Sequence, residues 1–153
     1  MTFDELQKMV DSFHALFLRE ISEPAPNRLR LILEEATAGE ETISMKVGGT
    51  VIEDLHPVRR TGRFFVLEWS NYVAYSVRNE SFASPDSARE VRESGSFLRI
   101  YGKSTFLEFV SEATIASAEY PGPLIHVCVV AEMHVIDVVS VQLPETRILP
   151  TRS

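Results

Sequence analysis

The chain has 153 residues, of which 44% are hydrophobic and 24% charged, values that fit one soluble globular domain over residues 1–153. Its formal net charge of -7 argues against nucleic acid and anionic membranes as partners, because both attract basic proteins. Its one cysteine excludes an intrachain disulfide, and the first residues, MTFDELQKMVDSF, lack the basic and apolar regions of a signal peptide. We therefore expect an acidic, soluble, cytoplasmic protein.

The N-terminal segment predicts a helix over residues 2–20. Thr2 and Glu5 have the spacing of a capping box, in which each side chain bonds the backbone amide of the other residue. Apolar side chains then recur at three- and four-residue steps: Leu6, Met9, Val10, Phe13, Leu16 and Phe17. A proline-containing segment at 22–27 ends this helix, and the alternation over 28–34 predicts a strand whose leucines face the core.

Turn signals organise the next part of the chain. Gly48 and Gly49 predict a tight turn between two short strands, at 43–47 and 50–52. A dense basic cluster follows, and we interpret it as a solvated turn, although such a cluster could also hold an anion or an acidic partner. It consists of Arg59, Arg60 and Arg63.

Two β-branched and aromatic runs, 64–69 and 72–78, flank Ser70-Asn71 and predict an antiparallel hairpin. Beyond them the sequence predicts an exposed loop at 82–94, a strand at 97–101, a second helix at 105–113 that begins after Ser104, and a long strand at 125–139. Strands mostly follow one another along the chain. This order favours an α+β fold with a curved, mostly antiparallel sheet, packed by the N-terminal helix and a second helix near 104–113.

The terminal strand carries the first candidate site, a cluster of metal-binding residue types. His126, Cys128, Glu132 and His134 all occupy even positions, so a regular strand would place them on one face. Imidazole, thiolate and carboxylate groups are common zinc ligands, and His56 is a further candidate. However, alternate residues lie roughly 7 Å apart along a strand, so other strands would have to complete such a site. The simpler interpretation is the second face of an ordinary strand.

The second candidate is a recognition surface around the predicted 72–78 strand. It combines aromatic, arginine and polar side chains, the types that protein interfaces favour. Its members are Trp69, Tyr72, Tyr75, Arg78, Asn79 and Glu80. The alternative is a normal hairpin whose aromatic residues pack on cross-strand neighbours.

The sequence contains little that indicates an enzyme. Cys128 with His126 or His134 has the residue types of a thiol nucleophile and its base, but the surrounding valines argue against a reactive thiol. Asp137 lies in the same apolar run, where a buried carboxylate needs a partner such as a backbone amide, Arg99 or His134.

The leading hypothesis is therefore a small non-enzymatic binding protein of bacterial type, with a protein or small molecule as its partner. One concrete form is an inhibitor or immunity-like protein whose acidic surface neutralises a basic partner. The alternative is a metal-binding protein or a metal-dependent enzyme that uses the His/Cys/Glu cluster. A third hypothesis is a homodimer that forms through an exposed edge of the valine-rich sheet.

Overall fold

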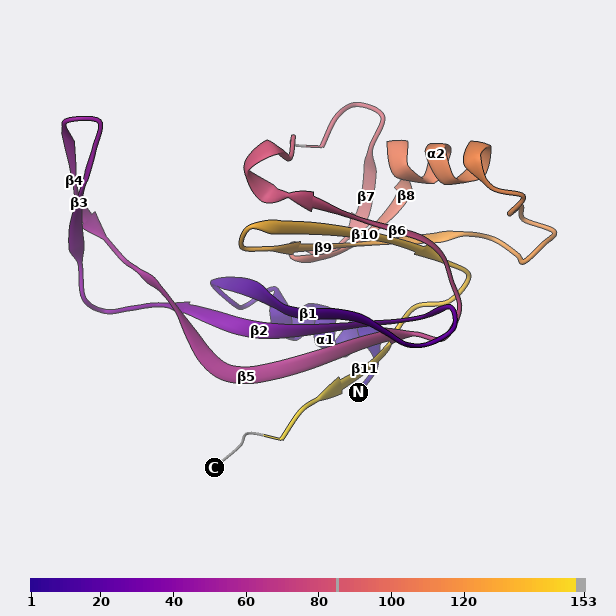
Figure 1. The fold of residues 1–153 in the computed structure, drawn as a ribbon, viewed down its shortest axis with the longest axis horizontal. Coiled ribbons are helices and arrows are strands. Elements are labelled where there is room, and N and C mark those ends of the chain that lie inside the picture. Colours follow the sequence, from indigo (N-terminus) through magenta and orange to yellow (C-terminus); the bar gives the residue numbers. More distant parts are fainter. Residues whose placement is uncertain (85, 151–153) are drawn as a thin grey trace.

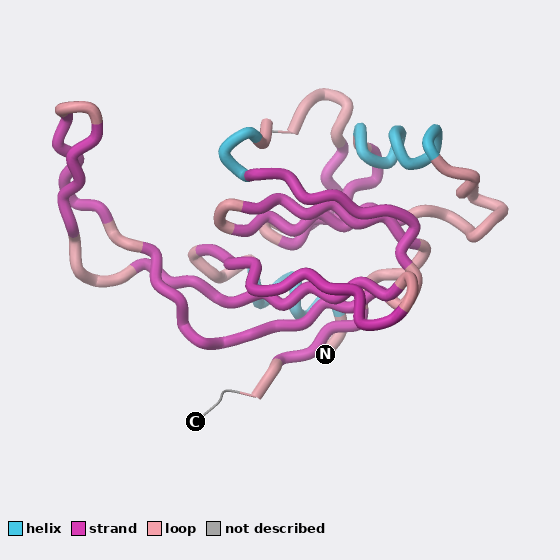
Figure 2. Tube along the Cα trace, viewed as in Figure 1, coloured by secondary structure: helices cyan, strands magenta, loops and turns pink. Residues whose placement is uncertain are grey.

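The computed structural model describes residues 1–84 and 86–150. Within these ranges the chain forms two antiparallel sheets that lie face to face, two α-helices, and one hairpin that projects away from the sheets (Figures 1 and 2). The α+β class and the mostly antiparallel sheet structure are confirmed. No helix in these ranges is long and apolar enough to cross a membrane.

Sheet I contains four strands in the order β1–β2–β5–β11. Their bounds are Ala15–Ala25 (β1), Arg28–Ala38 (β2), Val58–Trp69 (β5) and Glu145–Ile148 (β11). The alternation predicted for 28–34 is confirmed, since Leu29, Leu31 and Leu33 are buried on the inner face of β2. The even-numbered residues of β2 therefore lie on the outer face of sheet I.

Sheet II contains five strands in the order β6–β10–β9–β8–β7. Their bounds are Tyr72–Asn79 (β6), His134–Ser140 (β10), Ile125–Ala131 (β9), Leu98–Lys103 (β8) and Val91–Ser94 (β7). Its inner face supplies Val127, Val129 and Ile136 to a core that it shares with the leucines of β2. The other face of the same strands carries a second, smaller cluster around Tyr101 and Cys128.

Two α-helices and one short 3-10 helix complete the sandwich. Helix α1 (Phe3–Val10) begins at the predicted Thr2/Glu5 capping box and inserts three apolar side chains into the core: Phe3, Leu6 and Val10. Helix α2 (Thr105–Ala113) begins at Ser104, as predicted, and lies over the outer face of sheet II (Figure 1). The 3-10 helix η1 (Glu80–Phe82) follows β6 on the same side.

The projecting hairpin, here called the arm, consists of β3 (Ile43–Val47) and β4 (Thr50–Leu55). Gly48 and Gly49 form the turn that the sequence predicts, with φ values of 56° and 86° that a side chain would disfavour. The arm extends from the ends of β2 and β5 and stands clear of both sheets (Figure 1).

The first predicted helix is too long. Helix α1 ends at Val10, and residues from Ala15 onward form strand β1 instead. The apolar spacing over 13–17 fits either structure, but β1 pairs with β2 from Ala15 to Ala25, which satisfies its backbone groups and buries Leu16. Tertiary pairing therefore overrides the helical pattern.

The predicted terminal strand at 125–139 is also wrong, because the chain reverses at Glu132 and Met133. Ala131 pairs with His134, so β9 and β10 are the two arms of a tight hairpin. Met133 adopts a positive φ of 69°, a conformation that the usual turn residues, glycine and asparagine, adopt more readily. The turn therefore lacks the sequence signal that would reveal it.

Residues 64–69 and 72–78 do not form the predicted hairpin. Strand β5 pairs with β2 and β11 in sheet I, whereas β6 pairs with β10 in sheet II, so Ser70 and Asn71 carry the chain from one sheet to the other. The basic cluster is not a turn either, because Arg59, Arg60 and Arg63 lie within β5. Pairing of β5 with β2 continues past these arginines to Val58.

Candidate functional site

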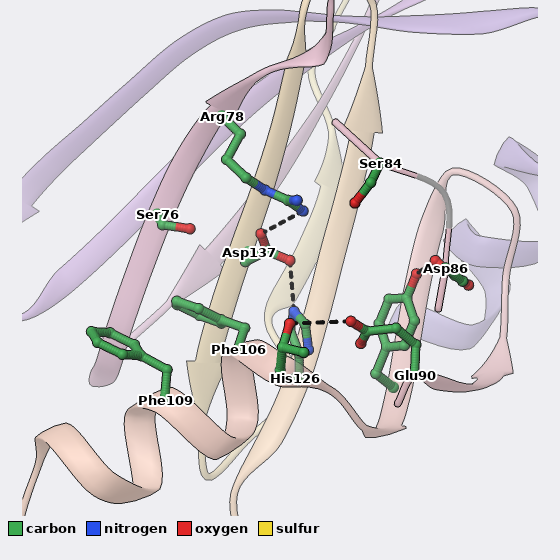
Figure 3. Close-up of a pocket in the computed structure, with 11 residues that line it drawn as sticks. Ser76, Arg78, Ser84, Asp86, Glu90, Phe106, Phe109, His126 and Asp137 are labelled. Atoms are coloured by element: carbon green, nitrogen blue, oxygen red, sulfur yellow. Dashed lines mark hydrogen bonds and ion pairs between the residues drawn. The ribbon is translucent and has the colours of Figure 1, made fainter. Parts of the chain in front are cut away.

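A pocket of about 370 Å³ opens on the outer side of sheet II. Its floor is the outer face of β6, β9 and β10, and its walls are helix α2 with Ser84, Asp86 and Glu90 (Figure 3). We call it the sheet II pocket. A smaller cavity of about 200 Å³ adjoins it and shares Arg78, Ser84, Asp86 and Tyr101.

The hairpin β9–β10 sets the floor of the sheet II pocket. Its register pairs Cys128 with Asp137, and β6 places Ser76 on the other side of Asp137. Alternation then puts His126 and Cys128 on this outer face, and Val127 and Val129 in the core. The predicted division of this segment into a polar and an apolar face is therefore correct within β9.

A chain of hydrogen bonds runs beneath the pocket through four side chains. Ser104 Oγ lies 2.7 Å from His126 Nδ1, and His126 Nε2 lies 2.8 Å from Asp137 Oδ1. Arg78 Nη2 donates to Asp137 Oδ2 over 3.1 Å (Figure 3). Ser104 Oγ also accepts the Leu107 amide, so its own proton is free to go to Nδ1, which leaves the imidazole proton on Nε2 to bond Asp137. This arrangement satisfies every member of the chain.

Asp137 is the electrostatic centre of this chain. Burial disfavours its charged form, but the hydrogen bond from His126 and the charge of Arg78 outweigh burial and hold the pKa of Asp137 below its ordinary value. Asp137 and His126 are almost completely buried, whereas the Arg78 side chain is half-exposed. The carboxylate is thus fixed in place, and Arg78 extends its charge toward the pocket.

A second polar cluster closes the neighbouring side of the pocket around Asp86. The Tyr101 hydroxyl donates to Asp86 Oδ1 over 2.6 Å, and Arg92 Nη2 lies 2.9 Å from Oδ2. Burial of Asp86 opposes ionisation, but these partners and Arg99 keep the pKa of Asp86 below its ordinary value. The Tyr101 ring stacks on His126 at 5.1 Å, which joins the two clusters.

The mouth of the pocket combines aromatic rings with a carboxylate. The Phe106 and Phe109 rings on α2 lie 6.3 Å apart, and Phe106 also lies 5.4 Å from the His126 ring. Glu90 Oε1 accepts the Thr105 hydroxyl over 3.1 Å, and no described basic side chain lies within salt-bridge distance of Glu90. The mouth is therefore negatively charged and flanked by exposed ring surface.

The residue types of a hydrolytic triad occur together in Ser104, His126 and Asp137. Their hydrogen bonds stabilise the fold and do not present a nucleophile to the pocket. Ser104 is 1% exposed, does not line the sheet II pocket and caps α2 through the Leu107 amide. A nucleophile must reach its substrate, and this hydroxyl does not. Burial also raises the pKa of the Cys128 thiol, as does the nearby carboxylate of Asp137, so this thiol stays protonated and unreactive.

The predicted metal ligands do not converge. His126 and Cys128 lie on the outer face of β9, but His134 shares a face of β10 with the core residue Ile136, and Glu132 lies in the turn. His56 is far away in the link between β4 and β5, where it bonds the Gly39 carbonyl. Across the residues that the structure describes, no group of three or more His, Cys, Asp or Glu side chains is placed to hold a metal ion.

The predicted recognition surface is also divided. Trp69 is buried in the core between the sheets, whereas Tyr72 and Tyr75 both donate to the carboxylate of Glu23 at the sandwich edge. A bulge between Tyr72 and Ala74 puts these two tyrosines on the same face, contrary to simple alternation. The hydrogen bond to Glu23, with some burial, raises the pKa of Tyr72 to about 12.

The remaining members of that predicted surface lie near the pocket. Arg78 lines it, Asn79 caps helix η1 through the Ser81 amide, and Glu80 borders the adjoining cavity. The sequence interpretation missed the pocket's other walls: Asp86, Glu90, Tyr101, Phe106 and Phe109. Asp137 was a useful signal, because a carboxylate in a valine-rich run must have a buried partner, but its partners are His126 and Arg78 and not the suggested Arg99 or His134.

The fold and the site define a two-sheet α+β protein with a polar pocket over one outer face. No protein-family model matches the chain, and no match was found among curated proteins or solved structures.

Proposed function

We propose that this protein is a non-enzymatic binding protein that takes a cationic side chain of a basic protein partner into the sheet II pocket. The observation that carries the proposal is the pocket lining, which holds the Glu90 carboxylate on one side of His126 and the Phe106 and Phe109 rings on the other (Figure 3). A pocket that combines a carboxylate with aromatic faces suits the cationic side chains of a basic partner, for which the carboxylate offers an ion pair and the rings a cation–π contact.

Glu90 is equipped for this role. Its Oε1 accepts the Thr105 hydroxyl, which orients the carboxylate, while no described residue donates a hydrogen bond to Oε2. Phe109 is 60% exposed, so its ring offers apolar surface at the entrance without any rearrangement. An incoming guanidinium would therefore meet an oriented acceptor and an open ring face.

Arg78 does not cancel this preference. Its charge is neutralised by Asp137 at 3.1 Å. The surrounding segment also favours a basic partner, because residues 80–119 contain more acidic than basic side chains. Together with the net charge of -7, this excess would steer a basic protein toward the site. An inhibitor or immunity-like protein is one form that such a binding protein takes.

The groups most suited to catalysis support a binding role instead. The Ser104 hydroxyl is enclosed and bonds both the Leu107 amide and His126, and the Cys128 thiol is held in its protonated form. These side chains build a rigid floor beneath the pocket, and rigid floors favour recognition because less order must be imposed on binding.

Isothermal titration with a capped tetra-arginine peptide tests this proposal. We expect binding to the unmodified protein, and a roughly tenfold loss of affinity, about 1.4 kcal/mol, for Glu90→Gln. Phe109→Ala should cost roughly two- to fivefold, the size of an exposed cation–π contact. A tetra-glutamate peptide should not bind.

Glu112→Gln is the matched control, since Glu112 is an exposed carboxylate on α2 that does not line the pocket. It should leave the affinity within twofold of the unmodified protein. Equal losses for Glu90→Gln and Glu112→Gln would mean that only diffuse charge attracts the peptide, and would overturn the proposed site. Absence of binding to the unmodified protein would overturn it as well.

A further inference from the structure

The arm has an apolar face that no residue in the described ranges, 1–84 and 86–150, covers. Its register pairs Ile43 with Leu55, Met45 with Ile52 and Val47 with Thr50, and directly paired residues lie on one face. Ile43, Met45, Val47 and Ile52 are between 42% and 54% exposed. An isolated two-stranded hairpin is marginally stable in water, so a partner that covered the apolar face would stabilise this one.

The opposite face of the arm is different. Lys46 pairs with Val51, and Ser44 lies on the same side, so this face is mostly polar. Around the apolar face the arm and its base, residues 40–55, carry four carboxylates against one lysine: Glu40, Glu41, Glu53 and Asp54 against Lys46. The arm is therefore an amphipathic, net negative hairpin.

The outer face of sheet I has the complementary character. Its centre is apolar and hollowed by a pocket of about 450 Å³, lined in part by Ile32, Phe64 and Leu149. No described helix packs on this face, whereas α2 covers the outer face of sheet II (Figure 1). An apolar hollow on a bare sheet face can receive an apolar stripe from outside.

At the rim of this face, the charged side chains that are exposed to solvent are mainly positive. Glu34 and Glu68 belong to it, but their side chains are only 5% and 9% exposed, because arginines lie over them. These arginines are much more exposed than the carboxylates they cover: Arg19, Arg28, Arg30 and Arg60. Arg147 adds a further exposed cation on β11, while the exposed Glu20 and Glu145 offset part of the charge.

We propose that two copies of this chain form a symmetric dimer in which each arm lies across the outer face of the partner's sheet I. The arm extends from β2 and β5, the central strands of that same sheet, so a twofold axis can exchange two identical contacts. Roughly 400 Å² of apolar arm surface per copy, matched by an equal area of each face, gives roughly 1,600 Å² in total, the size of a standard specific interface. The contact is independent of the sheet II pocket.

Sedimentation velocity and light scattering between about 1 and 100 µM test the dimer on the full chain. We expect a mass of about twice 17.2 kDa that falls to the monomer value on dilution. The double variant Met45→Asp/Ile52→Asp should be monomeric throughout, with an unchanged melting temperature once both proteins are compared as monomers. The matched control is Val51→Asp, an equally exposed arm residue on the polar face, and it should remain dimeric.

Chemical cross-linking identifies the surface on which the arm lies. A short bismaleimide should link Met45→Cys/Arg147→Cys protein into dimers much faster than Val51→Cys/Arg147→Cys protein. Arg147→Glu should weaken the dimer at least threefold at low salt. A monomer at 100 µM, equal effects of Met45→Asp/Ile52→Asp and Val51→Asp, or a dimer in which neither the Arg147 variant nor the cross-linker distinguishes the face would each overturn the proposal.

Discussion

Each of the two sheets carries on its outer face a buried carboxylate that is bonded by basic side chains, but the surroundings of the two carboxylates differ. On sheet II, Asp137 lies between His126 and Arg78 on the floor of the pocket, with α2 on one side of it. On sheet I, Glu68 lies between Arg28 and Arg30 with no helix above it. Each carboxylate receives hydrogen bonds from two basic side chains. The difference is that Asp137 belongs to a covered network and Glu68 to an open surface.

Both carboxylates are buried, and in both the bonds to basic partners outweigh the effect of burial, so both pKa values lie below the ordinary range. Their partners differ, however. The His126 ring is itself enclosed, whereas the side chains of Arg28 and Arg30 are 45% and 31% exposed. Loss of Asp137 therefore strands a buried polar group, whereas loss of Glu68 returns two arginines to water.

The largest expected effect is that of Asp137→Ala. It removes the acceptor of His126 Nε2 and leaves that buried donor without a partner, so we expect a loss of about 3–5 kcal/mol in the free energy of unfolding, measured with urea. Asp137→Asn, which retains an acceptor oxygen, should lose less. If Asp137→Ala lowered the free energy of unfolding by no more than Glu68→Ala does, the network around Asp137 would have no special role in stability.

Ser104→Ala comes next. It removes the N-cap of α2 and the hydrogen bond to His126 Nδ1 together, which should cost about 1–2 kcal/mol in urea unfolding. Ser104→Thr should recover part of this loss because it restores the hydroxyl. Ser111→Ala, an exposed serine on the same helix, is the control and should be neutral. A neutral Ser104→Ala would contradict the hydrogen-bond chain.

Acid should produce a smaller loss. Because the folded-state pKa values of Asp137 and Glu68 are lowered, the folded protein binds fewer protons than the unfolded chain near their ordinary values. Their stabilising contribution is therefore present above about pH 4 and is lost as the pH falls through the lowered folded-state pKa values. Urea unfolding between pH 6 and about 3 should show this decline, and Asp137→Asn should make it shallower.

Part of the fold could be predicted from the sequence, because some of its features depend only on residues that are close together in the chain. The capping residues Thr2 and Ser104 and the turn at Gly48-Gly49 act within a few positions, so spacing identifies them. The leucines of β2 reveal their face through simple alternation. Such features need no knowledge of which strands are neighbours.

The covered network depends instead on contacts between distant segments. His126 and Asp137 meet only because the chain reverses at Met133, where no glycine or asparagine marks the turn. Ser70 and Asn71 are typical turn residues in a hairpin, but here they connect two sheets, so their residue types do not distinguish the outcomes. Buried carboxylates such as Asp137 show that a partner must exist, without showing which side chain it is.

The smallest expected effect is that of Glu68→Gln, and it sharpens the comparison between the two faces. The amide keeps the shape and one acceptor oxygen but removes the negative charge that Arg28 and Arg30 share. Because both arginines can turn toward water, we expect a loss of about 1 kcal/mol or less in urea unfolding, and less still at high salt. Asp137→Asn should respond less to salt, since His126, one of its two partners, is shielded from ions. A Glu68→Gln loss as large and as salt-insensitive as that of Asp137→Asn would show that sheet I is covered in solution, as the proposed dimer requires at high protein concentration. We therefore expect the two variants to differ most, in their loss of stability and its salt dependence, in dilute protein, and to differ less as the protein concentration rises.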